Sequence, residues 1–356
     1  MLRVKRELFL QRLNEVAPGL SPKEVVEQTR CLVFQDGQIK TFNEEICCRT
    51  TSDLPKDFTG AVQAAPLRVI LQKLPEDEII LEQREGLLVV KGKGKETGIR
   101  MEKEILLPVA AVETPKKWQT LNTDFTDAVS IVQECAGKDE SKFIWTCVHI
   151  HPKWMEACDN FQLTRYTLDT GVEKPILVRR DAIKYVPGFD LSEIAETDSW
   201  LHFRGRNGLM LSCRRYEDEY QDLSPILKFK GEKAVLPKAL IEAAERANVF
   251  SEENTDNNQI MVELRPGKLR IRGEGSTGYH LEIKRLKYAG PPMKFMVSPK
   301  LLRKRPWTQG SSTTVSECTW PLPTSFTTQR KTTTGRPSRS GSQTPNRSPR
   351  KTWPFC

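Results

Sequence analysis

Hydrophobic and polar positions along the chain repeat a unit of about 58 residues, in which one helix accompanies a small sheet. Helix-opening patterns begin at six places: Arg6, Pro66, Thr123, Arg179, Pro237 and Pro299. The intervals between them are 60, 57, 56, 58 and 62 residues. Because a fixed period indicates an internal repeat, we expect six copies of one structural unit.

Short apolar stretches precede most of these helices, and alternating stretches with turn residues follow them. The lead-ins are "LRV", "GAVQA", "PILV", "KAVL" and "MKFMV", while the third, "WQTLN", is weaker. The clearest hairpins are "CLVFQDGQIKTF", "IILEQREGLLVV", "WLHFRGRNGLML" and "IMVELRPGKLRI". Alternation of apolar and polar residues around such turns is typical of antiparallel strands. Each unit is therefore predicted to contain a strand, a helix and then about three antiparallel strands.

Pairs of units are expected to form the domains, because one helix on one small sheet buries too little apolar surface to be stable. This gives an α+β fold with three similar domains at 1–115, 116–226 and 227–302. The sixth unit stops after its lead-in strand and first helical turn, near Leu302. The third domain is therefore predicted to be incomplete.

Residues 303–356 have a different composition from the rest of the chain. They contain 20 Ser or Thr, 7 Pro, 10 Lys or Arg and one acid, Glu317. This composition predicts disorder. A reading-frame change near codon 303 would explain why the repeat breaks off here. The alternatives are a basic arm that binds DNA non-specifically and a replacement segment with a role of its own.

The net charge of +9 is located entirely in that tail, since residues 1–302 contain 45 basic and 45 acidic residues. No apolar run approaches the roughly 18–20 residues needed to span a bilayer. The first residues alternate charge with hydrophobe, unlike a signal peptide. The nine cysteines are odd in number and lack a C-x-x-C motif, which favours free thiols in a reducing compartment. We therefore expect a cytoplasmic protein.

Three stretches resemble one known family. "ACDNFQL" (157–163), "YEDEYQDLSPIL" (216–227) and "AAERANVFSEENTDNNQIMVEL" lie where the bacterial β sliding clamp, the processivity factor of DNA polymerase III, has characteristic sequences. The resemblance covers about 1–302, in order and spacing more than residue by residue, as in a divergent phage or environmental member. It implies a non-enzymatic protein whose two protomers close head to tail around duplex DNA, with sheets outside and helices lining the hole.

The resemblance implies sequence-independent DNA contacts by basic residues on the helices and in one loop. The candidates are Arg12, Lys23, Arg68, Lys73, Arg180, Lys184 and Lys238. Arg180 and Lys184 are four residues apart and should share a helix face. The alternative is that these are ordinary solvent-facing residues, since any surface helix carries Lys and Arg. The third helix departs from the pattern with Asp124, Asp127 and Glu134.

The resemblance also implies an apolar pocket between the middle and third domains, which binds short peptides of the replicative polymerase and the clamp loader. Its expected residues are Asn160, Phe161, Gln162, Leu163 and Ile226. Phe161 and Gln162 replace the family's His and Arg, so peptide specificity is expected to differ. Alternatively, Phe161 and Leu163 are core residues of an ordinary strand. The family's C-terminal strand, which completes the pocket, is not recognisable here.

Ring closure into a homodimer is the other surface that the resemblance implies. Ile99 and Met101 alternate on one strand face, and Val249 with Phe250, after the fifth helix, would face them. Such alternation equally describes a half-buried strand. A chain with an incomplete third domain could also be a non-functional truncated clamp.

No catalytic or metal site is predicted, and no cofactor. Cys147, His149 and His151 share one strand face, with Cys158 on the next strand, but zinc ligands usually come as two pairs. A core face with polar edge residues is the expected alternative. An enzyme on this repeated scaffold, a nuclease or transferase, would need clustered carboxylates or histidines, and the sequence offers none.

Overall fold

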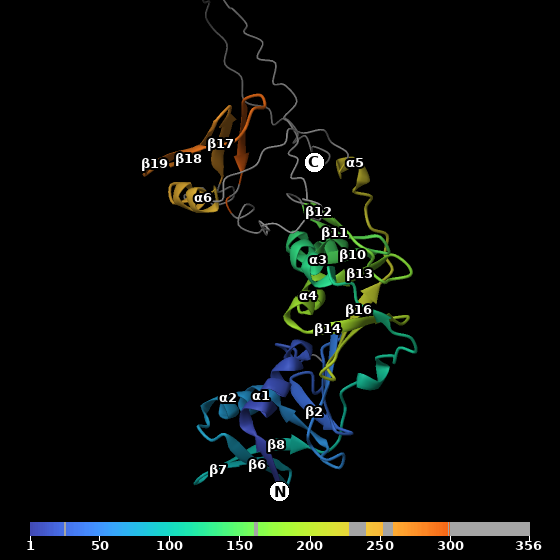
Figure 1. The fold of residues 1–356 in the computed structure, drawn as a ribbon. Helices are drawn as coiled ribbons and strands as arrows, with labels where there is room; N and C mark the ends of the chain where they lie inside the picture. The colour runs from blue at the N-terminus through green and yellow to red at the C-terminus, as the bar shows by residue number, and fades with distance from the viewer. Residues whose placement is uncertain (25, 160–162, 228–239, 252–258, 298, 300–356) are drawn as a thin grey trace, which may run out of the picture. The chain divides into compact units, whose positions relative to one another are not determined.

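Two antiparallel sheets organise the computed structural model, one in each of two units, Met1–Tyr220 and Gln221–Cys356 (Figure 1). The structure describes the whole chain except residues 25, 160–162, 228–239, 252–258, 298 and 300–356. The predicted tail, 303–356, therefore lies outside the described residues. Across the described residues, no helix is both long and apolar enough to cross a membrane.

The first half of the first unit contains two copies of the repeat. Its elements are β1 (Leu2–Lys5), α1 (Arg6–Glu15), β2 (Cys31–Gln35), β3 (Gln38–Phe42), β4 (Ile46–Thr51), β5 (Gly60–Gln63), α2 (Ala64–Lys73), β6 (Glu78–Arg84), β7 (Leu87–Gly92) and β8 (Lys95–Glu102). The β2–β3 turn is set by Asp36 and Gly37, whose φ angles of 56° and 71° suit the Asp-Gly pair of a two-residue hairpin.

The second half repeats this order with shorter helices. Its elements are β9 (Gln119–Thr120), α3 (Phe125–Val132), β10 (Cys147–His151), β11 (Trp154–Cys158), β12 (Leu163–Thr167), β13 (Ile176–Arg179), α4 (Arg180–Ile183), β14 (Leu191–Glu196), β15 (Trp200–Gly205) and β16 (Met210–Tyr216). The weak third lead-in forms only the two-residue β9. Five short 3₁₀ helices accompany these elements at Ala17–Gly19, Val109–Ala111, Gln133–Cys135, Glu140–Thr146 and Val186–Gly188.

The second unit contains α5 (Ser224–Leu227), α6 (Leu240–Asn248), β17 (Ile260–Arg265), β18 (Lys268–Gly275), β19 (Gly278–Arg285) and β20 (Met293–Val297). Its described strands are ordered β19-β18-β17-β20, and α6 packs on one face of them (Figure 1). The fifth lead-in and the predicted helix start at Pro237 lie outside the described residues. The sixth lead-in strand is formed as β20.

One ladder joins the two halves of the first unit into a continuous sheet. Strand β4 pairs with β16 in antiparallel register, with Cys48 opposite Leu211 and Cys47 opposite Ser212. The main path runs β1-β6-β7-β8-β5-β2-β3-β4-β16-β13-β10-β11-β12, and β15, β14 and β9 continue from β16. The first two predicted domains thus form one unit, which ends at Tyr220, six residues before the expected boundary at 226. The division into three domains stays a prediction.

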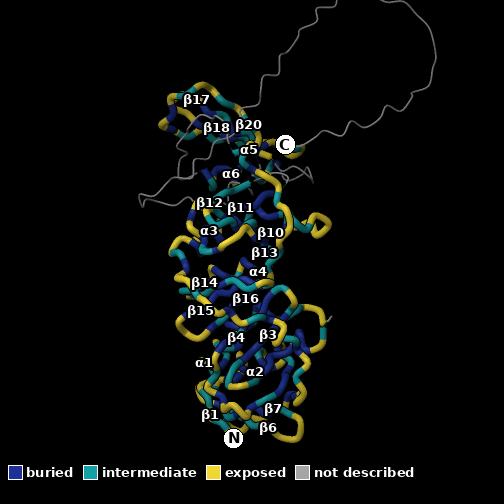
Figure 2. Tube along the Cα trace, turned by 90° about the vertical axis from the view of Figure 1, so that its right-hand side faces the viewer, coloured by how far each residue is buried: buried dark blue, intermediate teal, exposed yellow. Residues whose placement is uncertain are grey.

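The core lies between this sheet and the helices on one of its faces. Helix α1 buries Phe9 and Leu13, which are four residues apart, as expected for an amphipathic helix. Helix α3 buries Phe125 against Phe203 of β15, with ring centroids 5.5 Å apart. In the second unit, α6 buries Leu240 and three alanines against β17 and β18. Figure 2 shows these buried segments along the chain.

Candidate nucleic-acid and peptide interfaces

Arg12, a predicted DNA contact on α1, is held within the protein. Its Nη1 donates to Glu15 Oε2 at 3.0 Å and to the backbone oxygen of Asn207 at 3.2 Å. Glu15 is buried and also accepts hydrogen bonds from Thr50 and from the Asn207 side chain. Arg12 therefore links α1 to the β15–β16 turn. Its guanidinium group is already engaged by these two acceptors.

The two candidates on α2 differ in their surroundings. Arg68 donates from Nε and Nη2 to Asn14 Oδ1, at 3.1 and 2.9 Å, so its guanidinium packs against α1. Lys73 is exposed in the last turn of the helix. Of the two, Lys73 offers the more accessible charge.

The spacing of Arg180 and Lys184 suggested a shared face of one helix. In the structure α4 is a single turn, which Lys184 ends. The Lys184 N–H donates to the Arg180 carbonyl at 3.0 Å and closes that turn. Lys184 Nζ also donates to Asp181 Oδ1 at 2.8 Å, and this pair is largely exposed. Lys184 therefore presents a charge that Asp181 partly balances.

A polar cavity of about 270 Å³ lies beside α4. It is lined by Gly137, Lys138, Glu140, Thr146, Arg179, Arg180 and Asp181. Arg179 is committed to Glu140 at 2.5 Å, whereas the buried Nε of Arg180 has no hydrogen-bond partner among the described residues. The charged side chains of the lining are three basic and two acidic ones. Sequence analysis missed Lys138, because it follows Gly137 in a loop without periodicity.

The remaining candidate cations are Lys23, which lies in a loop, and Lys238. Lys23 is exposed, and its backbone N–H and carbonyl both bond the Ser21 hydroxyl. Lys238 lies outside the described residues. Among the described candidates, Lys23, Lys73 and Lys184 are the exposed ones.

The predicted peptide pocket is only partly described. Asn160, Phe161 and Gln162 lie outside the described residues. Leu163 begins β12 opposite Cys158 and is half-buried. Ile226 is exposed in α5, which belongs to the second unit. The pocket therefore stays a prediction.

Tyr220 is bound to the strand that precedes the predicted pocket, a contact that the sequence did not indicate. Its hydroxyl accepts the Cys158 N–H at 3.1 Å. Its ring stacks on His149, with centroids 4.7 Å apart. The end of the first unit is thereby fixed next to Cys158 and His149.

The face with Cys147, His149 and His151 carries an ion-pair network. His149 Nδ1 lies 2.8 Å from Oε1 of Glu156, and Arg165 Nε donates to Oε2 at 2.7 Å. Burial raises the pKa of Glu156, but these two hydrogen bonds outweigh it, and the pKa lies below its usual range. Across the described ranges, no group of three or more His, Cys, Asp or Glu residues is arranged to hold a metal ion.

The predicted ring-interface residues divide between buried and exposed positions. Ile99 and Met101 are buried in the main core, as the half-buried strand alternative describes. Val249 is exposed, and the half-buried Phe250 ring lies against Gly278, where an added Cβ would be 3.5 Å away. A role of these residues in ring closure stays a prediction.

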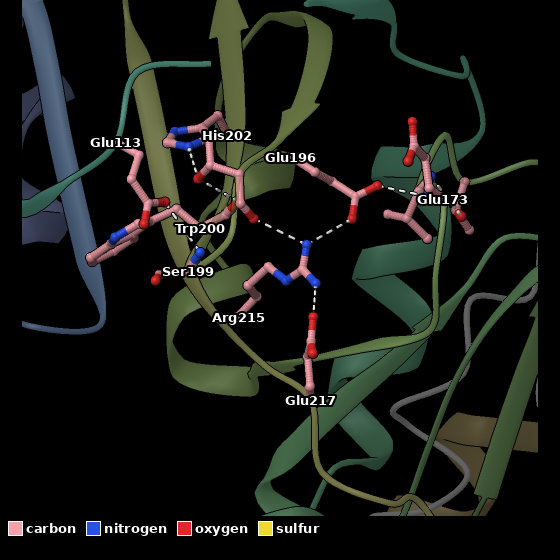
Figure 3. Close-up of polar contacts among 11 residues, drawn as sticks. Glu113, Glu173, Glu196, Ser199, Trp200, His202, Arg215 and Glu217 are labelled. Carbon is pink, nitrogen blue, oxygen red and sulfur yellow. Dashed lines mark hydrogen bonds and ion pairs between the residues drawn. The ribbon is translucent and has the colours of Figure 1, made fainter. Parts of the chain in front are cut away.

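A second polar network fixes the turn between β14 and β15 (Figure 3). Arg215 donates to Glu196 at 3.1 Å and to the Thr197 carbonyl, and it also pairs with Glu217. Glu113, from the segment after β8, accepts the Ser199 N–H at 3.1 Å. Burial depresses the pKa of nearby His202 to about 4. The network is structural, and it fastens the connecting segment to the second half of the first unit.

Comparison with known proteins identifies the fold. No protein-family model and no curated protein matches the chain. It is similar to the DNA polymerase III β-subunit sliding clamp of Pseudomonas aeruginosa bound to griselimycin, with TM-score 0.72, 16% identity, and 85% of this chain and 88% of that chain covered. For the griselimycin-bound clamp of Bartonella birtlesii the TM-score is 0.74 at 14% identity, and for the β subunit of Thermotoga maritima 0.70 at 16%, with the same coverage.

The chain therefore has the fold of a sliding clamp. The predicted α+β clamp architecture is confirmed, and so is the resemblance on which it rested. At these identities the likeness establishes the fold, and the function is argued separately.

Proposed function

We propose that the chain is a DNA sliding clamp, a cytoplasmic processivity factor with no chemistry of its own. Two copies would close head to tail around duplex DNA and tether the replicative polymerase, after loading by a clamp loader. The observation that carries the proposal is the clamp fold, which extends over 85% of the chain. A ring holds DNA by topology, so few charged contacts are needed, in agreement with a body of balanced charge.

DNA contact is assigned to the exposed lysines Lys23, Lys73 and Lys184, with Arg180 at the polar cavity. Arg12 and Arg68 would act mainly by fixing α1 and α2, because their guanidinium groups are engaged with the protein. Phosphate contacts by exposed lysines are sequence-independent and exchange rapidly, which suits movement along a duplex.

Ring closure is assigned to the edges of β8 and β19. Within the described sheets, β19 pairs only with β18, and β8 pairs with β5 only at Met101 and Glu102. Both strands therefore offer backbone groups to a second copy. Peptides of polymerase and loader would bind near Leu163 and Ile226, through apolar anchors of moderate affinity.

The test uses DNA topology. Loaded on a nicked circle, the protein should remain bound at high salt and be released when the circle is linearised. Binding that is lost at high salt and ignores topology would instead assign DNA binding to the basic residues of 303–356, and would overturn the clamp proposal. Size-exclusion chromatography adds a second readout. A stable dimer supports ring closure, whereas a monomer that is never retained on circles supports a non-functional truncated clamp.

A further inference from the structure

The chain forms three corresponding groups of strands, β2–β4 after α1, β10–β12 after α3 and β17–β19 after α6, and it covers the two faces of each sheet differently. One face of each sheet packs against helices. The opposite, outer face is covered by other segments in the first two cases, whereas in the third it exposes a row of apolar side chains on β19.

The outer face of β2, β3 and β4 is covered by residues 102–113. Leu107, Val109 and Val112 pack there with Val33 and Phe42 in a separate apolar cluster. Arg49 of β4 donates from Nη2 to the carbonyls of Val109 and Val112, at 2.9 and 3.3 Å. The covering segment contains three glutamates and one lysine. An acidic segment with apolar anchors thus lies on a sheet face that carries an arginine.

The outer face of β10, β11 and β12 is covered in a similar way. Its anchor is Tyr220, which stacks on His149 and accepts the Cys158 N–H. The residues just before this tyrosine are Glu217, Asp218 and Glu219. In the same row of this face, Glu156 lies between His149 and Arg165 and bonds both of them.

The outer face of β17, β18 and β19 is apolar and basic. On β19 the exposed residues are Tyr279 at 61%, Leu281 at 37% and Ile283 at 62%. His280, Glu282 and Lys284 of this strand alternate with that row and point to the helix side, where Arg246 of α6 forms a bidentate pair with Glu282. Apolar side chains in a row on a solvent-facing strand indicate an interaction surface.

Basic side chains stand next to this apolar row. The strand register places Arg272 opposite Leu281 and Arg270 opposite Ile283. The basic residues on this face are Arg265, Lys268, Arg270, Arg272, Arg285 and Lys294, and the acidic ones are Glu263 and Glu274. The buried Nε atoms of Arg270 and Arg272 have no hydrogen-bond partner in the described part of the chain. Arg270 and Arg272 pair with Glu263 and Glu274, at 3.7 and 3.0 Å, and with six basic and two acidic residues the face keeps a surplus of positive charge.

We propose that this third outer face binds an acidic, extended segment of another protein that carries apolar anchor residues. The same chain uses such segments to cover its first two outer faces, so the chemistry of the occupant follows from its own structure. Its own residues 303–356 are unsuitable, because they contain 10 basic residues and one acid. Nucleic acid is less suited, since only Tyr279 offers a ring for stacking in the apolar row. The face stays accessible if a second copy pairs with the β19 edge, because side chains project perpendicular to the hydrogen-bonding direction.

The test measures fluorescence anisotropy of a labelled peptide with the sequence of residues 216–227, added to the full chain. We expect micromolar binding that weakens with salt, and no binding of a peptide with Lys at each acidic position. The double variant Arg270→Glu/Arg272→Glu should weaken binding by about tenfold or more. Leu281→Ser/Ile283→Ser should do the same without loss of fold, because both side chains are exposed. Lys116→Glu/Lys117→Glu is the matched control, since it changes the charge equally at exposed positions elsewhere.

Four other occupants would give different results, and each would overturn the proposal. Loss of binding to phosphatidylserine vesicles or to a 12-nucleotide oligothymidylate in these variants, with no peptide binding by the wild type, would assign the face to a membrane or to nucleic acid. Self-association abolished by the variants would assign it to a second copy. Intramolecular cross-links from Lys268 to Lys304 or Lys331 would assign it to the chain's own tail. These outcomes do not depend on ring closure, so the clamp proposal can fail or hold separately.

Discussion

Arg12 donates a hydrogen bond to the backbone oxygen of Asn207, 195 residues further along the chain, at 3.2 Å. The Asn207 side chain returns to the same site by donating to Glu15 Oε1 at 3.2 Å. Helix α1 is thereby fastened to the turn between β15 and β16. Arg12, for which the resemblance implies DNA contact, therefore also connects the two halves of the first unit.

Replacing Arg12 by Ala should lower the free energy of unfolding by about 1–3 kcal/mol, because the buried Glu15 carboxylate loses its cationic partner. Urea unfolding measures the change. Lys73→Ala is the control, since Lys73 is exposed and its loss should stay within about 0.5 kcal/mol. Equal effects of the two substitutions would contradict the connecting role of Arg12.

His202 should make stability depend on pH. Burial depresses its pKa from 6.5 to about 4, so between these values the unfolded chain binds a proton that the folded chain does not. Stability therefore falls as pH decreases through this window, by up to about 3 kcal/mol at its lower end. His202→Gln should flatten this dependence between pH 6.5 and 4.5, whatever it does to absolute stability. An unchanged slope in the variant would exclude His202 as its source.

The repeat could be predicted from the sequence because hydrophobic period and turn residues are local properties. The start of α1 at Arg6 and four hairpins followed directly from them. The length of α4 could not be predicted in this way. Its single turn is followed by the Val-Pro-Gly segment Val186–Gly188, which ends the helix. Spacing alone suggested a face shared by Arg180 and Lys184 on a longer helix.

Tyr220→Phe tests the attachment of the segment that ends the first unit. Loss of the hydroxyl leaves the Cys158 N–H without its acceptor, at a cost of about 1 kcal/mol. Hydrogen exchange of the Cys158 amide should accelerate by roughly fivefold for that free energy. In Tyr216→Phe, whose hydroxyl donates to Glu45 instead, exchange at Cys158 should not change.

Gly273→Ala tests the packing of α6 on β18. A Cβ at this position would lie 1.6 Å from the carbonyl oxygen of Ala247, so helix and strand must separate. We expect about 3 kcal/mol or more of destabilisation, confined to the second unit. Hydrogen exchange should accelerate in β17–β19 and stay unchanged in β2–β5. Gly188→Ala, where no atom lies within 4 Å of the added Cβ, should leave both units unaffected.

Contacts between distant residues could not be predicted from the sequence. The sequence pattern places Arg12 and Arg68 on helices. It does not reveal that Arg12 donates to Asn207 or that Arg68 donates to Asn14. Similarly, alternation placed Ile99 and Met101 on one strand face without saying that this face is the core. Such partners are set by strand order, which brings together segments nearly two hundred residues apart.

The β4–β16 ladder has a mechanical consequence for any ring built from this chain. The backbone ladder between these strands aligns four successive residue pairs, from Met210 and Arg49 to Cys213 and Ile46, and alternate pairs exchange hydrogen bonds. Bending between β4 and β16 would break several of those hydrogen bonds together, so the first unit should move as one rigid body. If the ring opens to admit DNA, the opening must come from a joint beyond Tyr220 or from the contact between copies.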